Sequence, residues 1–199
     1  MDILLEARSV IIGSLLGDGY LYPKGTLQIE HCLAHAEYTQ WKYEKLRVIS
    51  GKEPTIVKRY DTRTGKTYRS SRFFTKAVLK DFRIAFYPEK KKVIPSQLGD
   101  WLDHLALAVW FMDDGSRGAH TPKGLVFNTS CFSSEEQIVL QSLLREKFGI
   151  NVSIHNVGKG YHLYVQANSY DRFHGIVFPH LITLMRYKLP VDPVTTLLL

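Results

Sequence analysis

Two segments of the chain are apolar on nearly every side, and each ends in an Asp-Gly pair. The first is Ile11-Ile12-Gly13-Ser14-Leu15-Leu16-Gly17-Asp18-Gly19, and the second is Leu107-Ala108-Val109-Trp110-Phe111-Met112-Asp113-Asp114-Gly115. A helix that is apolar around most of its surface packs inside a protein rather than on its surface. The pattern therefore predicts two buried helices, each ending beside a carboxylate.

The polar and apolar pattern that follows the first segment is repeated after the second. Asp18 and Asp114 lie 96 positions apart in a chain of 199 residues. Segment 27–32 aligns without gaps on segment 125–130, and Glu37 then aligns with Glu135. An internal repeat of this length predicts two copies of one structural unit.

Each half continues with a hairpin, a helix and a lysine-proline signal. Alternating positions and glycine-containing turns predict strands over 55–60, 68–75, 152–157 and 161–166. The closing signals are Lys92-Val93-Ile94-Pro95 and Lys188-Leu189-Pro190. Each half thus contains helix, two strands, helix, two strands, helix, which predicts an α+β fold with pseudo-twofold symmetry. The strand residues expected to face the helices are Ile56, Val57, Phe73, Phe74, Val152, Ile154, Leu163 and Val165.

The segment Gln97-Leu98-Gly99-Asp100 is the best candidate for the boundary between the halves. It divides the chain into an N-terminal subdomain, 1–98, and a C-terminal subdomain, 99–199. Asp100 is expected to cap the second apolar helix. Because the segment is too short for a free linker, the two subdomains are expected to share one core and form one pseudo-dimeric unit.

Packing of the two apolar helices side by side would bring Asp18 and Asp114 together at one end. Two carboxylates this close repel each other unless a cation lies between or beside them. Hard oxygen ligands suit Mg²⁺, and paired ions of this kind hydrolyse phosphodiesters by activating water and stabilising the leaving oxygen. The alternative is that each Asp-Gly pair only ends a helix, with its glycine in the left-handed conformation.

Composition and charge favour a polyanionic partner. The chain has 26 Lys and Arg against 19 Asp and Glu, which gives a net charge of +7, and its apolar content of 45% is that of an ordinary globular protein. Two cysteines, Cys32 and Cys131, are too few for a disulfide scaffold and are interpreted as free thiols in a reducing compartment. Neither a signal peptide nor a membrane span is predicted, so an intracellular protein without a membrane partner is expected.

The two motifs, their spacing and the lysine-proline closures resemble the LAGLIDADG homing endonucleases, in particular the monomeric kind with two motifs. The resemblance extends from about Ser9 to Pro190, and the second motif followed by Ser116 is its most specific part. It implies two αββαββα halves whose antiparallel four-stranded sheets form a DNA-binding saddle, with the motif helices packed at the centre. It also implies a site-specific endonuclease that cuts double-stranded DNA across the minor groove and leaves short 3′ overhangs.

The resemblance assigns roles to residues that match the family pattern. Asp18 and Asp114 match the metal-binding acids, and the carbonyls of Gly17 and Asp113 would complete the ligation, while the Asp113 side chain is expected to pack or cap. Two further pairs complete the predicted catalytic set, namely the basic residues Lys92 and Lys188 and the polar strand residues Glu30 and Asn128. Lys91 remains an alternative to Lys92. Mg²⁺ is the implied cofactor, with Mn²⁺ able to replace it and Ca²⁺ binding without efficient cleavage.

The resemblance also directs one face of each sheet toward double-stranded DNA. Because the two halves carry different side chains, a monomer with a long asymmetric target is expected. The predicted DNA contacts are Tyr22, Lys24, Gln28, Lys58, Arg59, Arg63, Lys66, Arg69, Arg72, Arg117, His120, Lys123, His155, Asn156, Lys159, His162 and Gln166.

Two other functions are compatible with the sequence. One is an RNA-splicing cofactor, or maturase, whose partner is its own intron RNA, and the other is a catalytically silent DNA-binding regulator. A zinc site at His31, Cys32 and His35 is not favoured, because no second ligand pair with suitable spacing follows. These three residues are interpreted as part of an amphipathic helix.

Overall fold

The computed structural model describes residues 4–118 and 123–190. Its first half follows the predicted order of elements. These are α1 (Leu5–Leu16), β1 (Tyr20–Leu21), β2 (Leu27–Cys32), α2 (Ala36–Lys45), β3 (Thr55–Asp61), β4 (Lys66–Phe74) and α3 (Lys80–Phe86). The short helix α4 (Leu98–Trp101) follows, and the predicted subdomain boundary after residue 98 falls within it.

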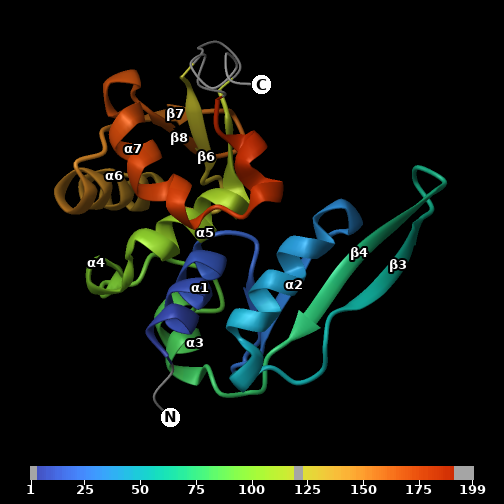
Figure 1. Cartoon of the computed structure of the whole chain (residues 1–199). Helices are drawn as coiled ribbons and strands as arrows, with labels where there is room; N and C mark the ends of the chain where they lie inside the picture. The colour runs from blue at the N-terminus through green and yellow to red at the C-terminus, as the bar shows by residue number, and fades with distance from the viewer. Residues whose placement is uncertain (1–3, 119–122, 191–199) are drawn as a thin grey trace.

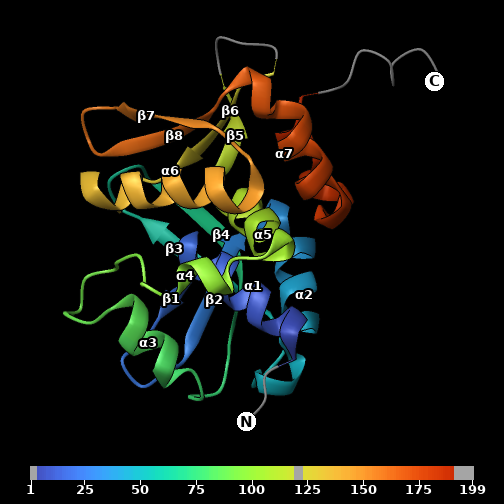
Figure 2. The same ribbon diagram turned by 90° about the vertical axis from the view of Figure 1, so that its left-hand side faces the viewer.

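The second half repeats this order. Its elements are α5 (His104–Asp114), β5 (Gly115–Arg117), β6 (Leu125–Asn128), α6 (Ser134–Phe148), β7 (Val152–Asn156), β8 (Tyr161–Val165) and α7 (Tyr170–Val177). The sheets are antiparallel and equivalent, with strand orders β1-β2-β4-β3 and β5-β6-β8-β7. Figures 1 and 2 show the two halves on either side of α1 and α5. The predicted α+β fold with two αββαββα halves is therefore confirmed.

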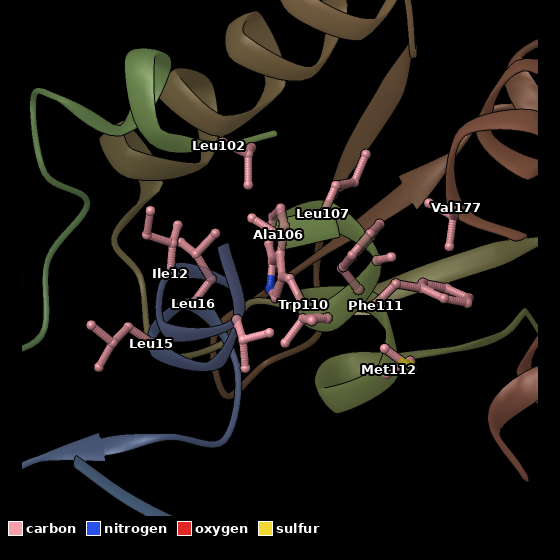
Figure 3. Close-up of a cluster of buried hydrophobic side chains, with 14 of the residues drawn as sticks. Ile12, Leu15, Leu16, Leu102, Ala106, Leu107, Trp110, Phe111, Met112 and Val177 are labelled. Atoms are coloured by element: carbon pink, nitrogen blue, oxygen red, sulfur yellow. The ribbon is translucent and has the colours of Figure 1, made fainter. Parts of the chain in front are cut away.

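The two motif helices pack directly against each other, and glycine makes their close approach possible. A Cβ atom at Gly13 would lie 2.5 Å from the carbonyl oxygen of Ala106 and 2.6 Å from Cβ of Val109. Figure 3 shows side chains of α1 and α5 meeting in the core around Trp110, which is completely buried. Any larger residue at position 13 would push the helices apart, because packed interiors have no space to absorb extra atoms.

The glycines of the Asp-Gly pairs lack the left-handed conformation that the alternative explanation predicts. Neither Gly19 nor Gly115 adopts the left-handed conformation of a helix-ending glycine, and Gly115 has a φ of −80°. Both are instead crowded, since a Cβ at Gly115 would lie 2.1 Å from the ring of Phe111. Steric crowding next to the carboxylates, rather than helix termination, requires glycine at these positions.

The cap of α5 differs from the prediction. Asp103, not Asp100, is the N-cap residue, and its side chain accepts a hydrogen bond of 2.7 Å from the Ala106 N–H. Asp100 lies within α4, a separate turn of helix that the apolar pattern did not reveal. The Asp103 carboxylate also accepts a hydrogen bond from Ser9 Oγ of α1, so it links the two motif helices.

The helix-facing side of the sheets agrees with the prediction except at three positions, one of which is Val57, which the register places on the outer face with Glu30 and Arg59. Phe73, Val152, Leu163 and Val165 are buried, whereas Ile56 and Phe74 are exposed. Phe74 follows Phe73 directly, so alternation points it to the outer face. Ile56 lies on β3, the edge strand of the first sheet, and is exposed although its cross-strand partner Ser71 is buried.

The cysteines and the helices of the described residues bear on the predicted free thiols and the predicted lack of a membrane span. Both cysteines are free, as predicted, and both are exposed. Among residues 4–118 and 123–190, no helix has the length and apolar character needed to cross a membrane.

Candidate active site

Asp18 and Asp114 lie near each other where the motif helices end. α1 stops at Leu16, which leaves Asp18 just beyond its last turn, whereas Asp114 is the last residue of α5. Burial and the charge of Asp113 raise the pKa of Asp18, and burial and the charge of Asp18 raise the pKa of Asp114 to about 7. The negative charge of Asp18 therefore opposes ionisation of Asp114, although burial is the larger cause of that shift.

Each carboxylate is accompanied by a lysine in an equivalent position. Lys92 Nζ donates a hydrogen bond of 2.8 Å to the Gly17 carbonyl, and Lys188 Nζ donates one of 3.0 Å to the Asp113 carbonyl. Burial lowers the pKa of both lysines. Lys91, by contrast, is exposed. The structure therefore brings Asp18, Asp114, Lys92, Lys188 and the two predicted carbonyls together at one place.

The side chain of Asp113 is completely buried, and both of its oxygens accept hydrogen bonds. Its oxygens accept hydrogen bonds of 2.7 and 2.8 Å from Lys42 Nζ and one of 2.8 Å from the Tyr38 hydroxyl. Oδ2 also lies 3.3 Å from the Asp18 backbone nitrogen, which donates to it. Lys42 and Tyr38 belong to α2 in the first half, so this network connects the halves directly beneath the carboxylates. Sequence reasoning missed both residues, because nothing local signals a charge pair formed between distant segments.

His31 is a third residue that sequence reasoning missed. It lies on β2 rather than in the expected helix, with only 6% of its side chain exposed, and its Nδ1 is 3.7 Å from Asp18 Oδ2. Burial and the charge of Lys42 lower the pKa of His31 to about 3, so the imidazole is neutral at pH 7. Asp18, His31 and Asp113 offer oxygen and nitrogen atoms close enough together to surround a metal ion. Cys32, also placed in a helix by the sequence, follows on the same strand.

Glu30 and Asn128 occupy equivalent strand positions but have different surroundings. Glu30 forms a two-pronged ion pair with Arg59 and accepts hydrogen bonds from Ser70 and Gln28. The Arg59 bond lowers the pKa of Glu30. Asn128 is exposed and accepts a bond of 2.8 Å from the Ser130 hydroxyl. Glu30 lines one cleft together with Asp18 and His31, but its oxygens are directed into the sheet network.

Cross-strand pairing shows which predicted DNA contacts share a face. Neighbours across strands point to the same side of a sheet. By this register, Gln28, Arg59 and Arg72 share the outer face of the first sheet with Glu30, and His155 and His162 share that of the second with Asn128. Lys58, Arg69 and Asn156 occupy the alternate face, where the sequence did not place them.

The remaining predicted DNA contacts lie at strand ends or in turns, or they bind neighbouring side chains. Tyr22 donates a hydrogen bond of 2.8 Å to Gln28, and Gln166 donates one of 3.1 Å to Ser153. Lys123 instead forms an ion pair of 3.1 Å with Asp171 of α7. The exposed residues in or beside the β-turns and on the edge strand are Lys24, Arg63, Lys66, Arg117 and Lys159. His120 lies outside the described residues.

Removal of the Asp114 charge is expected to stabilise the protein in the absence of divalent cations. The folded-state pKa of about 7 lies above the usual 3.8, so ionisation of Asp114 destabilises the fold progressively between pH 4 and 7. Above pH 7, we expect Asp114→Asn to raise the free energy of unfolding by about 1 to 2 kcal/mol. Below about pH 4, where Asp114 is protonated in both states, the substitution should leave the free energy of unfolding unchanged. Urea denaturation in EDTA across this pH range measures the difference. A difference that does not change with pH would contradict the assigned repulsion.

Comparison with known proteins relates the whole chain to one family. The model of the LAGLIDADG DNA endonuclease family matches residues 8–173. The chain is 32% identical to the cytochrome b mRNA maturase bI2 of Saccharomyces cerevisiae, over 93% of this chain and 47% of that protein. It is 31% identical to the probable intron-encoded endonuclease 1 of Wickerhamomyces canadensis, over 92% of this chain and 83% of that protein. The chain thus spans about half the length of the yeast maturase.

A solved structure shows the same architecture. The homing endonuclease I-WcaI, bound to its DNA recognition sequence, matches with a TM-score of 0.89 and 26% identity. The match covers 96% of this chain and 89% of that chain. The similarity therefore includes both halves and the central pair of helices.

Proposed function

Because the chain belongs to the LAGLIDADG DNA endonuclease family, we propose that it is a site-specific endonuclease that hydrolyses both strands of a DNA duplex across the minor groove. The observation that carries the proposal is the pairing of Asp18 and Asp114 at the ends of two packed helices, each beside a buried lysine. A structural protein would have little reason to retain two carboxylates close together at the ends of packed helices.

The residues at this site suit a divalent cation. Burial, together with the charges of neighbouring aspartates, raises the pKa of both Asp18 and Asp114, and a bound cation would favour their ionised forms. The carbonyls of Gly17 and Asp113 each accept a lysine N–H and retain a second lone pair. Bound at these oxygens, Mg²⁺ would supply an activated water and stabilise the leaving oxygen. Mn²⁺ replaces it in this proposal, and Ca²⁺ binds without efficient cleavage.

The two lysines hold positive charge beside the carboxylates. Their carbonyl hydrogen bonds fix each ammonium group at the end of a motif helix. From there Lys92 and Lys188 can stabilise the negative charge that develops on a phosphate in the transition state. Glu30 and Asn128 complete the proposed catalytic set from the adjoining strands.

The outer faces of the sheets supply the proposed DNA contacts. In the first sheet, Gln28, Arg59 and Arg72 present hydrogen-bond donors around Glu30, while the second presents histidines and Asn128. Since these sets differ, the two halves read different sequences, and a monomer recognises a long asymmetric target. The division into subdomains 1–98 and 99–199 belongs to this proposal, one subdomain serving each half of the target.

Cleavage of a randomised duplex library tests the proposal. The protein is incubated with the library in Mg²⁺ or in Ca²⁺, and the ends of the products are sequenced. We expect discrete double-strand cuts with short 3′ overhangs in Mg²⁺ and binding without efficient cleavage in Ca²⁺. Sequence-specific binding without cleavage in either ion would favour a catalytically silent regulator.

Replacement of the site lysines is expected to slow cleavage without abolishing it. Lys92→Ala and Lys188→Ala each remove one positive charge beside a carboxylate, so we expect the single-turnover rate to fall about 10- to 100-fold. Lys91→Ala, which changes the exposed neighbour, is the matched control and should leave the rate unchanged. Full activity in the double variant of Lys92 and Lys188 would remove both from the mechanism.

A splicing cofactor is a second candidate because a relative 32% identical to this chain is named a maturase. The net charge of +7 serves an RNA partner as well as a DNA partner. Splicing of the host intron in vitro, with and without the protein, tests this candidate. Accelerated splicing together with an inactive library assay would favour the maturase, whereas activity in both assays would indicate a dual role.

A further inference from the structure

The two halves of the site differ at one strand position that borders the carboxylates. His31 on β2 lies beside Asp18, whereas the repeat places Thr129 at the equivalent position in the second half. Thr129 is buried, and its hydroxyl is engaged with Gln137 and with the Tyr161 carbonyl. The imidazole of His31 therefore has no counterpart beside Asp114.

The geometry of His31 is that of a ligand directed into the site. Nδ1 lies 3.7 Å from Asp18 Oδ2, and Nε2 is buried without a hydrogen-bond partner. Two atoms that each lie about 2.1 Å from one ion are at most ~4.2 Å apart, so Nδ1 and Oδ2 can bind the same ion. Nε2 faces Asp113 Oδ1 at 4.0 Å on the other side of the ring, so the nitrogen directed at Asp18 is Nδ1.

Asp113 is close to the same atoms but is already neutralised. Its Oδ1 is 4.0 Å from His31 Nε2, yet both of its oxygens accept hydrogen bonds from the Lys42 ammonium. A cation bound through these oxygens would lie against that ammonium and be repelled. Asp18, half exposed and without a lysine on its oxygens, is the carboxylate that pairs with His31.

We infer that His31 is a nitrogen ligand to the cation held by Asp18, so that the two halves of the site prefer different metals. This inference rests on the proposed function. Imidazole favours Mn²⁺ and the later transition metals over Mg²⁺, which prefers oxygen. The Asp18 half therefore binds Mn²⁺ in preference to Mg²⁺, whereas the Asp114 half, in which Thr129 takes the place of the imidazole, does not share this preference.

Direct binding of Mn²⁺ to the protein without DNA tests the inference. Electron paramagnetic resonance measures free Mn²⁺ during a titration, and Mg²⁺ is then added as a competitor. We expect His31→Gln, which keeps the approximate size and polarity of the side chain, to weaken the tightest Mn²⁺ site about tenfold or more. His180→Ala, which removes a histidine on the far side of α5 beside Asp103 and His104, is the control and should bind Mn²⁺ like the wild type.

Two results would overturn the inference. One is equal Mn²⁺ affinity in the wild type and in folded His31→Gln, with folding checked by circular dichroism. The other comes from the wild-type protein labelled with ¹⁵N-histidine and needs no variant. Substoichiometric Mn²⁺ should broaden the His31 ring signals first, and their persistence while other histidine signals broaden would exclude His31 as a ligand.

The binding experiment also separates this inference from the proposed function. Mn²⁺ binding at His31 without DNA cleavage would refute the endonuclease and leave the ligand assignment intact. If the enzyme is active, strand-specific labelling gives a further expectation. In Mg²⁺ one strand should be cut faster than the other, and Mn²⁺ should reduce this difference in the wild type but not in His31→Gln.

Discussion

Asp114→Asn is expected to lower the rate of DNA cleavage about a thousandfold or more while changing DNA affinity less than about threefold. The substitution keeps the size of the side chain but removes the charge that would hold the cation. Most of the affinity comes from phosphate and groove contacts on the sheets, which Asp114 does not make. Single-turnover cleavage in Mg²⁺ and gel-shift binding in Ca²⁺ measure the two quantities separately.

The equivalent variant in the first half should behave in the same way. Asp18→Asn is expected to abolish double-strand cleavage to a similar extent, because both strands must be cut and each carboxylate would hold the cation of one half of the site. Asp81→Asn, which changes an exposed aspartate in the first turn of α3, is the control for a general loss of negative charge. Cleavage near the wild-type rate in either site variant, or a parallel loss of binding in both, would contradict the assignment.

Lys42→Met is expected to reduce the free energy of unfolding by about 3 to 5 kcal/mol. Lys42 and the Asp113 side chain are completely buried, so loss of the ammonium group leaves a carboxylate without a compensating charge. Asp113→Asn leaves the buried ammonium group with only an amide oxygen and should have a similar effect. The double variant Lys42→Met/Asp113→Asn should recover most of the loss, because no buried charge remains and the new amide oxygen can still accept the hydrogen bond from Tyr38.

Urea denaturation of the four proteins provides this double-mutant cycle. The surface pair of Lys45 and Glu6, which joins α2 to α1, serves as a matched control. Lys45→Met is expected to cost less than about 1 kcal/mol, because solvent already screens that pair. If Lys42→Met cost no more than Lys45→Met, the buried pair would not stabilise the fold.

Much of the fold could be predicted because its determinants are local and occur twice. The hairpin strands were placed to within a few residues by alternation and by glycine turns, and Gly65 and Gly158 do adopt the positive φ values of such turns. The predictions were wrong where contacts with distant segments, rather than the local sequence pattern, decide the structure. Ile56 is apolar but exposed on an edge strand, and Asp103 caps α5 because α4 intervenes before it.

The candidate site was predictable only for residues that repeat. The matching lysines and aspartates could be recognised because each has a partner 96 positions away. His31, Tyr38 and Lys42 have no such partner, and each is important through contact with a residue far along the chain. A polar residue in a helical segment is predicted to be exposed, and only the packed structure shows that Lys42 is buried against Asp113.

The Lys42-Asp113 pair also bears on how this molecule could be divided or recombined. The repeat aligns Asp113 with Gly17 and Lys42 with Leu140, so each half carries one member of the pair. A symmetric dimer of second halves would bury two such aspartates without a lysine, and a dimer of first halves would bury two lysines without an aspartate. A second copy of either half alone would therefore leave buried charges unpaired at this interface. A chimera that exchanges one half will keep its central interface only if the donor half carries the complementary charge.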